Sequence, residues 1–252
     1  MSGLPRSSHA LVTGGRGIGR EIASSLVQAG ATVTVLGRNR KALDDLVTAG
    51  VAHAAVIADV ADQAAMNSAL AEAAGRQPID ILVANAGIAE SAPFGKTDAV
   101  MFRRMLDVNF MGVVYAAQAV LRPMVQRRQG RIVAIASTAG LRGYSYVSAY
   151  CAAKHAVVGL VRSLALEVAT SGVTVNAVCP GFTDTDLVAG SIDNIMSKTG
   201  RSRDEAIAEL AKHNPQGKLV TPAEVANAVV WLCSPGASSV TGQTIAVAGG
   251  EI

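Results

Sequence analysis

Three polar side chains in the middle of the chain, Ser137, Tyr150 and Lys154, have the types and spacing that acid–base chemistry needs. Tyr150 and Lys154 are four positions apart, so in a helix they lie on one face, one turn apart. A phenol ionises with a pKa of about 10, and a neighbouring ammonium lowers that value. We therefore expect Tyr150 to act as a general acid or base, with Lys154 lowering its pKa and Ser137 donating a hydrogen bond to a substrate oxygen.

A fourth candidate is Asn109, a polar residue in the apolar helical stretch LDVNFMG. A buried asparagine needs hydrogen-bond partners. The pattern leaves two interpretations open. Asn109 either bends its helix and holds a water that leads to Lys154, or makes a hydrogen bond within the helix.

A glycine-rich turn near the N-terminus, LVTGGRGIGR, indicates a nucleotide-binding loop. An apolar strand is followed by the glycines Gly14, Gly15, Gly17 and Gly19, and a helical pattern begins at Ile18. Glycines let the backbone approach a pyrophosphate, and the helix N-terminus supplies free N–H groups. The spacing does not fit GxGxxG, so a tight turn without a ligand remains the alternative.

The end of the second expected strand, Leu36-Gly37-Arg38-Asn39, indicates which dinucleotide is bound. An NAD enzyme usually places a carboxylate there for the ribose 2′-hydroxyl. Arg38, with Arg16 in the glycine loop, suits a 2′-phosphate instead. We therefore expect NADP(H) to be preferred, with NAD(H) possible. The alternative is that both arginines are solvated surface residues.

Two further strand ends are candidates for the adenosine half of the cofactor. Asp59, followed by Val60, could accept a hydrogen bond from the adenine amino group, or could cap the following helix. Asn85, Ala86 and Gly87 have the small, turning composition that lets backbone lie against the cofactor, or they form an ordinary turn.

Strands and helices alternate along the chain, which predicts an α/β fold with a parallel sheet covered on both faces. The expected strands are Ala10–Thr13, Thr32–Leu36, Ala54–Ala58, Ile81–Ala84, Arg131–Ala136, Thr174–Val178 and Thr244–Val247. The expected helices are Glu21–Ala29, Gln63–Ala74, Ala99–Val125, Tyr150–Ser171 and Pro222–Leu232. We expect one domain over residues 1–252, with a substrate lid around residues 186–213.

Composition narrows the classes of partner. Half of the 252 residues are hydrophobic and the formal net charge is +3, with no basic run of five or more, so nucleic acid is not expected. The three cysteines, Cys151, Cys179 and Cys233, form neither a disulfide framework nor a metal-binding pair, so we expect no metal and a cytoplasmic location. No apolar run reaches about 18 residues, so no membrane span is expected.

Taken together, these motifs resemble the short-chain dehydrogenase/reductase family over nearly the whole chain. The matching pieces are TGGRGIG, ADV at Asp59, NAG at Asn85–Gly87, Asn109, Ser137, YCAAK, PGFTDT and TGQTIAVAGG. The resemblance implies a single-domain Rossmann fold with a doubly wound, seven-stranded parallel sheet, a Ser–Tyr–Lys triad assisted by Asn109, and a homotetramer. It also places Pro180, Gly181, Thr183 and Thr185 beside the nicotinamide. Lys154 could also hydrogen-bond the nicotinamide ribose.

The chain departs from this family in its glycine loop. The family's usual TGxxxGIG has three residues between its first two motif glycines, whereas this chain has two, Gly15 and Arg16. Since Gly17, Ile18 and Gly19 are intact, we expect a functional but tightened loop. Cofactor binding that is undetectable by calorimetry at millimolar NADPH and NADH would contradict this.

Substrate choice is expected to depend on the loop after Ser137, with Leu141, Tyr144 and Tyr146 joining Ser137 and Tyr150, and on the lid. Lys198, Arg201 and Arg203 form a local cluster of cations that could meet the phosphates of coenzyme A or a carrier, or could be a solvated face. The resemblance favours a nicotinamide-dependent oxidoreductase acting on a 3-oxoacyl or 3-hydroxyacyl thioester. A carrier-free ketone or secondary alcohol is the close alternative, and a non-catalytic nucleotide-binding protein is a further one.

Overall fold

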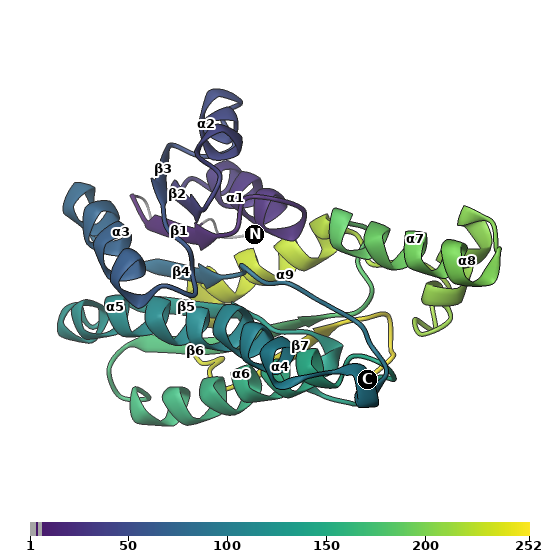
Figure 1. Ribbon diagram of the computed structural model, residues 1–252. Coiled ribbons are helices and arrows are strands. Elements are labelled where there is room, and N and C mark those ends of the chain that lie inside the picture. Colours follow the sequence, from purple (N-terminus) through teal and green to yellow (C-terminus); the bar gives the residue numbers. More distant parts are fainter. Residues whose placement is uncertain (1–3, 5–6) are drawn as a thin grey trace.

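The computed structural model describes residue 4 and residues 7–252; residues 1–3 and 5–6 of the expected domain lie outside the described residues. Its centre is one seven-stranded parallel sheet in the order β3-β2-β1-β4-β5-β6-β7 (Figure 1). The strands are β1 His9–Thr13, β2 Thr32–Gly37, β3 Ala54–Ile57, β4 Ile81–Ala84, β5 Gly130–Ile135, β6 Val173–Pro180 and β7 Thr244–Val247. The seven predicted strands and the doubly wound fold are confirmed.

Helices cover both faces of the sheet (Figure 1). They are α1 Ile18–Gln28, α2 Arg40–Thr48, α3 Gln63–Arg76, α4 Ala99–Leu106, α5 Gly112–Arg127, α6 Ser148–Glu167, α7 Asp186–Thr199, α8 Arg203–Ala211 and α9 Pro222–Cys233. Four short turns complete the order: η1 Phe94–Lys96, η2 Asp107–Met111, η3 Thr138–Gly140 and η4 Pro235–Ala237.

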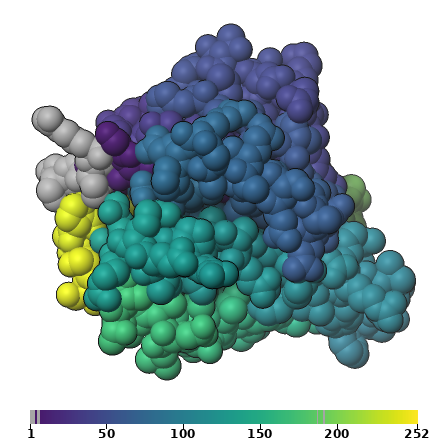
Figure 2. Space-filling view, turned by 90° about the vertical axis from the view of Figure 1, so that its left-hand side faces the viewer, coloured from purple at the N-terminus to yellow at the C-terminus, as the bar shows by residue number. Residues whose placement is uncertain are grey.

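Two hydrophobic cores lie on the two faces, because successive strand residues point to opposite sides. Leu11 of β1 packs in the core beneath α3, α5 and α6, whereas its neighbours Ala10 and Val12 pack beneath α1, α2 and α9. In Figure 2 the chain's successive segments are stacked in colour order on one face, from the N-terminal half at the top to the green of α6 at the bottom.

Two helical regions differ from the expectation. Helix α2 was not predicted, and only Leu43 and Leu46 of its nine residues are buried. The expected helix Ala99–Val125 is interrupted by η2, a π-helical turn over Asp107–Met111 that contains Asn109. A π turn locally widens a helix and is frequent at functional sites.

The predicted lid segment forms two helices that project from the body in Figure 1. Gly200 separates α7 from α8 in the left-handed conformation, with φ of 69°. A capping box follows at once: Ser202 and Glu205 bond reciprocally at the start of α8. Whether this segment acts as a lid stays a prediction.

The combined helix Ala99–Arg127 is long and apolar enough to cross a membrane by length and composition alone, with a mean hydropathy of 1.2. Val113, Val120 and Met124 of this helix are buried in the core beside the sheet. Core packing accounts for part of its apolar composition, and a single helix of this kind is weak evidence for a membrane span.

At the amino end of β1, the buried ring of His9 makes two hydrogen bonds. Its Nδ1 lies 2.8 Å from the Gln77 carbonyl oxygen, so Nδ1 donates, and its Nε2 accepts from the Thr34 hydroxyl at 2.9 Å. Burial is the main cause that lowers the pKa of His9 from 6.5, and this favours the neutral ring, in which Nε2 is the acceptor.

We expect His9 to make folding stability depend on pH. Below pH 6.5 the His9 ring binds a proton in the unfolded chain, whereas in the folded chain it does so only at lower pH. The His9 contribution is therefore complete above pH 6.5 and is lost as the pH falls toward the lowered folded value. Urea unfolding of the wild type and of His9→Gln at pH 7.5 and 5.5 checks this, with the exposed His155→Gln as control. An unchanged pH dependence in His9→Gln would contradict it.

Candidate active site

The predicted site residues gather at the carboxyl ends of the strands, around the point where the strand order reverses. That point lies between β1 and β4, which pair with each other while their neighbours continue in opposite directions. Ligands of open α/β sheets bind at such a switch point. The glycine loop after β1 and the turn after β4 meet there.

The glycine loop enters α1 intact despite its missing residue. Gly17 is the N-cap of α1 with φ of 50°, Gly14 has φ of 81°, and the Gly19 N–H donates to the Arg16 carbonyl at 3.0 Å. A Cβ on Gly19 would lie 1.9 Å from the Gly14 carbonyl oxygen, so no other residue fits there. Ile18, the first residue of α1, is half-buried, and Arg16 is exposed.

Thr13, the last residue of β1, was not among the predicted site residues but holds the loop in place. Its hydroxyl oxygen accepts the backbone N–H groups of Asn85 and Ala86, each at 3.0 Å. The Asn85 side chain donates in return to the carbonyls of Thr13 and Gly14, at 2.9 and 3.2 Å. Asn85 therefore ties the two turns together. A hydroxyl directly before the first glycine was the available signal for Thr13.

Asn109 fixes the segment that follows this turn. Its Oδ1 accepts from the Ile88 N–H at 3.1 Å, and its Nδ2 donates to the carbonyls of Ile88 and Met105, each at 3.0 Å. The bond to Met105 is the hydrogen bond within the helix that one interpretation predicted. The π turn is a local irregularity of the helix, as the interpretation of a bend predicted. A Cβ on Gly87 would lie 2.7 Å from Asn109 Oδ1 and 3.7 Å from Lys154 Nζ, so Gly87 lets these groups approach. We regard Asn109 as a positioning residue.

Ser137 and Tyr150 come together from two elements. Ser137 follows β5 and begins η3, where its hydroxyl oxygen accepts from the Ala139 N–H at 3.1 Å. Tyr150 is the third residue of α6, and its hydroxyl is in hydrogen-bonding contact with the Ser137 side chain. One turn along, the Lys154 ammonium donates to the Ile135 carbonyl at 2.8 Å and lies 5.7 Å from the centroid of the Tyr150 ring.

The pKa values of this group differ from the expectation. Burial raises the pKa of Tyr150 to about 12, and Ser137 only partly offsets this. Burial likewise lowers the pKa of Lys154 to about 8. The expectation that Lys154 lowers the pKa of Tyr150 is therefore wrong for this arrangement, in which the ammonium is directed at the Ile135 carbonyl. The phenol is protonated at neutral pH.

Arg38 and Asp59, predicted for opposite parts of the adenosine, face each other at 3.5 Å between Arg38 Nη1 and Asp59 Oδ2. Asp59 does not cap α3, because Asp62 does so by accepting from the Ala65 N–H. Asp59 Oδ1 instead accepts from the Ala61 N–H at 3.0 Å. The capping alternative is wrong, and the exposed arginine stands beside the predicted adenosine site. Val60 is buried against Gly112.

We expect Arg38→Asp to shift the ratio of kcat/KM for NADPH over NADH toward NADH by about 10- to 100-fold, because a charge-assisted pair is lost. Steady-state kinetics with both cofactors measure the ratio. Arg76→Asp on α3, also an exposed ion-paired arginine, is the matched control. An unmoved ratio in Arg38→Asp would show that the 2′-phosphate assignment is wrong.

The segment Pro180–Thr185 crosses from the end of β6 to the start of α7. Pro180 is buried, and the Gly181 N–H donates to the Val247 carbonyl at 3.1 Å. Thr183 is 3% exposed, and its hydroxyl donates to the Gly181 carbonyl at 3.0 Å. Thr185 stands against the glycine loop, since a Cβ on Gly17 would lie 3.0 Å from Thr185 Cγ2. The predicted nicotinamide and pyrophosphate residues therefore border one site.

The predicted substrate residues are placed differently from one another. Leu141 is half-buried beside the core, whereas Tyr146 is 66% exposed with a left-handed backbone at φ of 68°. The Tyr144 hydroxyl contacts Glu251, a residue that the sequence analysis did not single out. Glu251 is the second-last residue, and no local pattern marks it.

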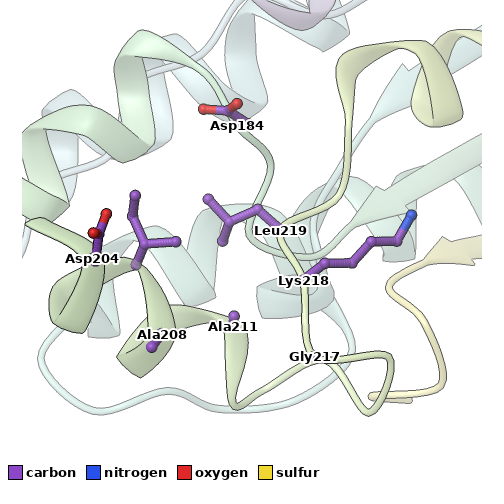
Figure 3. A pocket seen from close by; sticks show the side chains of 8 residues that line it. Asp184, Asp204, Ala208, Ala211, Gly217, Lys218 and Leu219 are labelled. Atoms are coloured by element: carbon purple, nitrogen blue, oxygen red, sulfur yellow. The ribbon is translucent and has the colours of Figure 1, made fainter.

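Two of the three clustered cations of the predicted lid, Arg201 and Arg203, are ion-paired within it. Arg201 lies 2.8 Å from Glu209, and Arg203 lies 3.8 Å from Asp193. This favours the solvated-face interpretation over a phosphate site. A hollow of about 460 Å³ lies between α8 and residues 217–219, with Asp184 at its rim (Figure 3), but none of the predicted site residues lines it.

The residues present fit a dinucleotide. Gly14 and Gly17 have positive φ, the space at Gly19 admits no Cβ, and the N-terminus of α1 opens onto the same edge as Ser137. Within the described residues, no group of three or more His, Cys, Asp or Glu side chains could hold a metal ion.

Comparisons with known proteins identify the family. A family model described as enoyl-(acyl carrier protein) reductase matches residues 12–251. Galactitol 2-dehydrogenase (L-tagatose-forming) of Cereibacter sphaeroides is 39% identical over 246 residues, covering 96% of this chain and 93% of that protein. The 3-oxoacyl-(acyl-carrier-protein) reductase of Vibrio harveyi is 38% identical over 246 residues, covering 96% of each.

A solved structure has a similar level of sequence identity. A variant of actinorhodin polyketide ketoreductase, crystallised with NADPH, superimposes with a TM-score of 0.92 at 37% identity and 97% coverage of both chains. The predicted family is therefore confirmed. The chain belongs to the short-chain dehydrogenase/reductase family of NAD(P)-dependent oxidoreductases.

Proposed function

We propose that this chain reduces a ketone to a secondary alcohol and catalyses the reverse oxidation, with NADP(H) as its preferred cofactor. The observation that carries the proposal is the Tyr150 hydroxyl in contact with Ser137 at the end of β5, one turn from buried Lys154. The NADPH in the related ketoreductase and the exposed Arg38 beside Asp59 support the choice of cofactor. NAD(H) is the second candidate.

We propose a task for each residue from this geometry. A bound nicotinamide would supply the hydride. Ser137 donates a hydrogen bond to the substrate oxygen, and Tyr150 gives that oxygen its proton as negative charge develops there. Because the pKa of Tyr150 is raised to about 12, the proton is in place at neutral pH, and the site is ready for reduction. The reverse reaction needs the phenolate, so oxidation is expected to speed up as pH rises.

Two classes of substrate are considered. A 3-oxoacyl thioester is supported by the name of the Vibrio harveyi relative, and a carrier-free ketone or polyol by the galactitol dehydrogenase. The ion pairs of Arg201 and Arg203 are the one observation that favours the carrier-free class, because they leave the lid fewer free cations for a carrier phosphate.

A substrate panel tests the proposal. Oxidation of NADPH and NADH is followed by absorbance with 3-oxoacyl-CoA thioesters, cyclic and aromatic ketones, keto sugars and a 2-enoyl thioester. Turnover of any ketone supports the proposal, and the preferred class decides between thioester and carrier-free substrates. Turnover of the enoyl thioester alone, or tight NADPH binding without any turnover, would contradict it.

We also propose a cytoplasmic homotetramer. Leu166 on α6 is 81% exposed beside a hollow of about 420 Å³ shared with residues 241–244, which supports contact between copies. Light scattering coupled to gel filtration measures the mass.

A further inference from the structure

Glu251 is a buried carboxylate at the end of the chain. Its side chain is 2% exposed, although the next residue, Ile252, is 52% exposed. Gly249 and Gly250 bring it there, with φ of 62° and 96°, conformations that favour glycine. A Cβ on Gly249 would lie 1.8 Å from Asn214 Oδ1, so the C-terminal turn is pressed onto the residues just after α8.

The Glu251 carboxylate is held from several directions. Its Oε1 accepts a hydrogen bond from the Tyr144 hydroxyl, and Arg142 Nη1 and His213 Nδ1 lie at 3.9 and 3.8 Å from the same oxygen. The Tyr144 oxygen also lies 2.7 Å from Thr138 Oγ1. A carboxylate can only accept hydrogen bonds, so the Tyr144 hydroxyl uses its one proton to donate to Glu251. The Thr138 hydroxyl therefore donates to the Tyr144 oxygen.

Aromatic contacts extend this cluster to both ends of the α7–α8 segment. The Tyr144 ring meets Phe182 edge-on at 6.1 Å and His213 at 5.7 Å, and the Phe182 and His213 rings lie 5.4 Å apart. Phe182 precedes α7 and His213 follows α8. The buried Glu251 carboxylate therefore links the loop after Ser137 to the residues on both sides of the predicted lid.

We propose that Glu251 is a positioning residue that determines substrate affinity by fixing Tyr144, and through Tyr144 the loop opposite the lid. This rests on the proposed ketone reduction. The Tyr144 hydroxyl is already engaged with Glu251 and Thr138, so Tyr144 acts on the substrate through the position of its loop rather than as a hydrogen-bond donor. Glu251 makes the free energy of substrate binding more favourable, because a loop that is already fixed loses less entropy when substrate binds.

Kinetics of Tyr144→Phe, Glu251→Ala and the double variant test the proposal. Each single variant is expected to raise KM for the ketone about 10-fold, as for loss of one charge-assisted hydrogen bond, with kcat changed less than about twofold. The double variant is expected to be no worse than either single variant, because both remove one interaction. Glu251→Gln should recover part of the loss, since its amide oxygen still accepts from Tyr144. Glu72→Ala, an exposed ion-paired carboxylate on α3, is the control.

Hydrogen exchange gives a readout that does not need turnover. Glu251→Ala is expected to speed amide exchange in residues 138–147 and 212–217 and to leave β1 and β4 unchanged. If the wild type reduces no ketone, the proposed function fails while this readout still tests the Glu251 contact. Unchanged KM in both single variants, multiplied effects in the double variant, or unchanged exchange would each overturn the proposal. Tyr144→Phe keeps the test valid if Glu251→Ala does not fold.

Discussion

Tyr150→Phe is expected to lower kcat for ketone reduction by about 10²- to 10⁴-fold, the usual contribution of a positioned general acid. The substitution removes only the hydroxyl that contacts Ser137, and the ring keeps its packing on α6 beside Met105 and Ala153. NADPH affinity should therefore be nearly unchanged. Steady-state kinetics and calorimetric titration of NADPH separate the two quantities.

Tyr115→Phe is the matched control, because it makes the same change on a partly buried tyrosine of α5. It should retain wild-type kcat. A Tyr150→Phe enzyme that turns over at the wild-type rate would show that another group supplies the proton.

The second large effect is expected from Gly19→Ala, which should weaken NADPH binding about 100-fold, the cost of losing one or two hydrogen bonds to a charged pyrophosphate. The added methyl carbon would lie 1.9 Å from the Gly14 carbonyl oxygen and 2.4 Å from Asn85 Nδ2. Both are fixed parts of the predicted pyrophosphate loop, so the loop itself must move. Calorimetry measures the affinity, and urea unfolding measures the accompanying loss of stability.

Gly75→Ala on α3 makes the same chemical change where a Cβ meets nothing within 4 Å. It should leave NADPH binding unchanged and raise the free energy of unfolding by about 0.5–1 kcal/mol, since alanine is favoured in helices. Equal NADPH affinities of Gly19→Ala and the wild type would mean that the glycine loop does not bind the cofactor.

Most of the fold could be predicted from the sequence, because strands buried on both faces give short apolar runs. The five inner strands were found for this reason, whereas the half-buried edge strands β3 and β7 were found from their apolar and β-branched residues. Helix α2 was missed because it is only nine residues long and mostly polar, with Leu43 and Leu46 as its two buried residues. The bonds between the Asn109 side chain and Ile88, 21 residues earlier in the chain, could not be predicted, because local pattern does not place so distant a partner.

The site could be predicted in its members but not in its electrostatics. A four-residue spacing brings Tyr150 and Lys154 to one face, yet it does not show that the ammonium turns to the Ile135 carbonyl. Burial of both groups, a property of the whole fold, then sets the direction of their pKa values. Glu251 lies 107 residues from Tyr144 in the chain, so only the folded structure reveals that contact.

A double-mutant cycle on Ser137 and Tyr150, measured by single-turnover oxidation of NADPH in a stopped-flow instrument, tests the central claim most directly. If the two hydroxyls act on one substrate oxygen as a unit, Ser137→Ala and Tyr150→Phe each slow the step severely. The double variant is then about as slow as Tyr150→Phe alone. Rates that multiply independently, or fast turnover in Tyr150→Phe, would contradict the account.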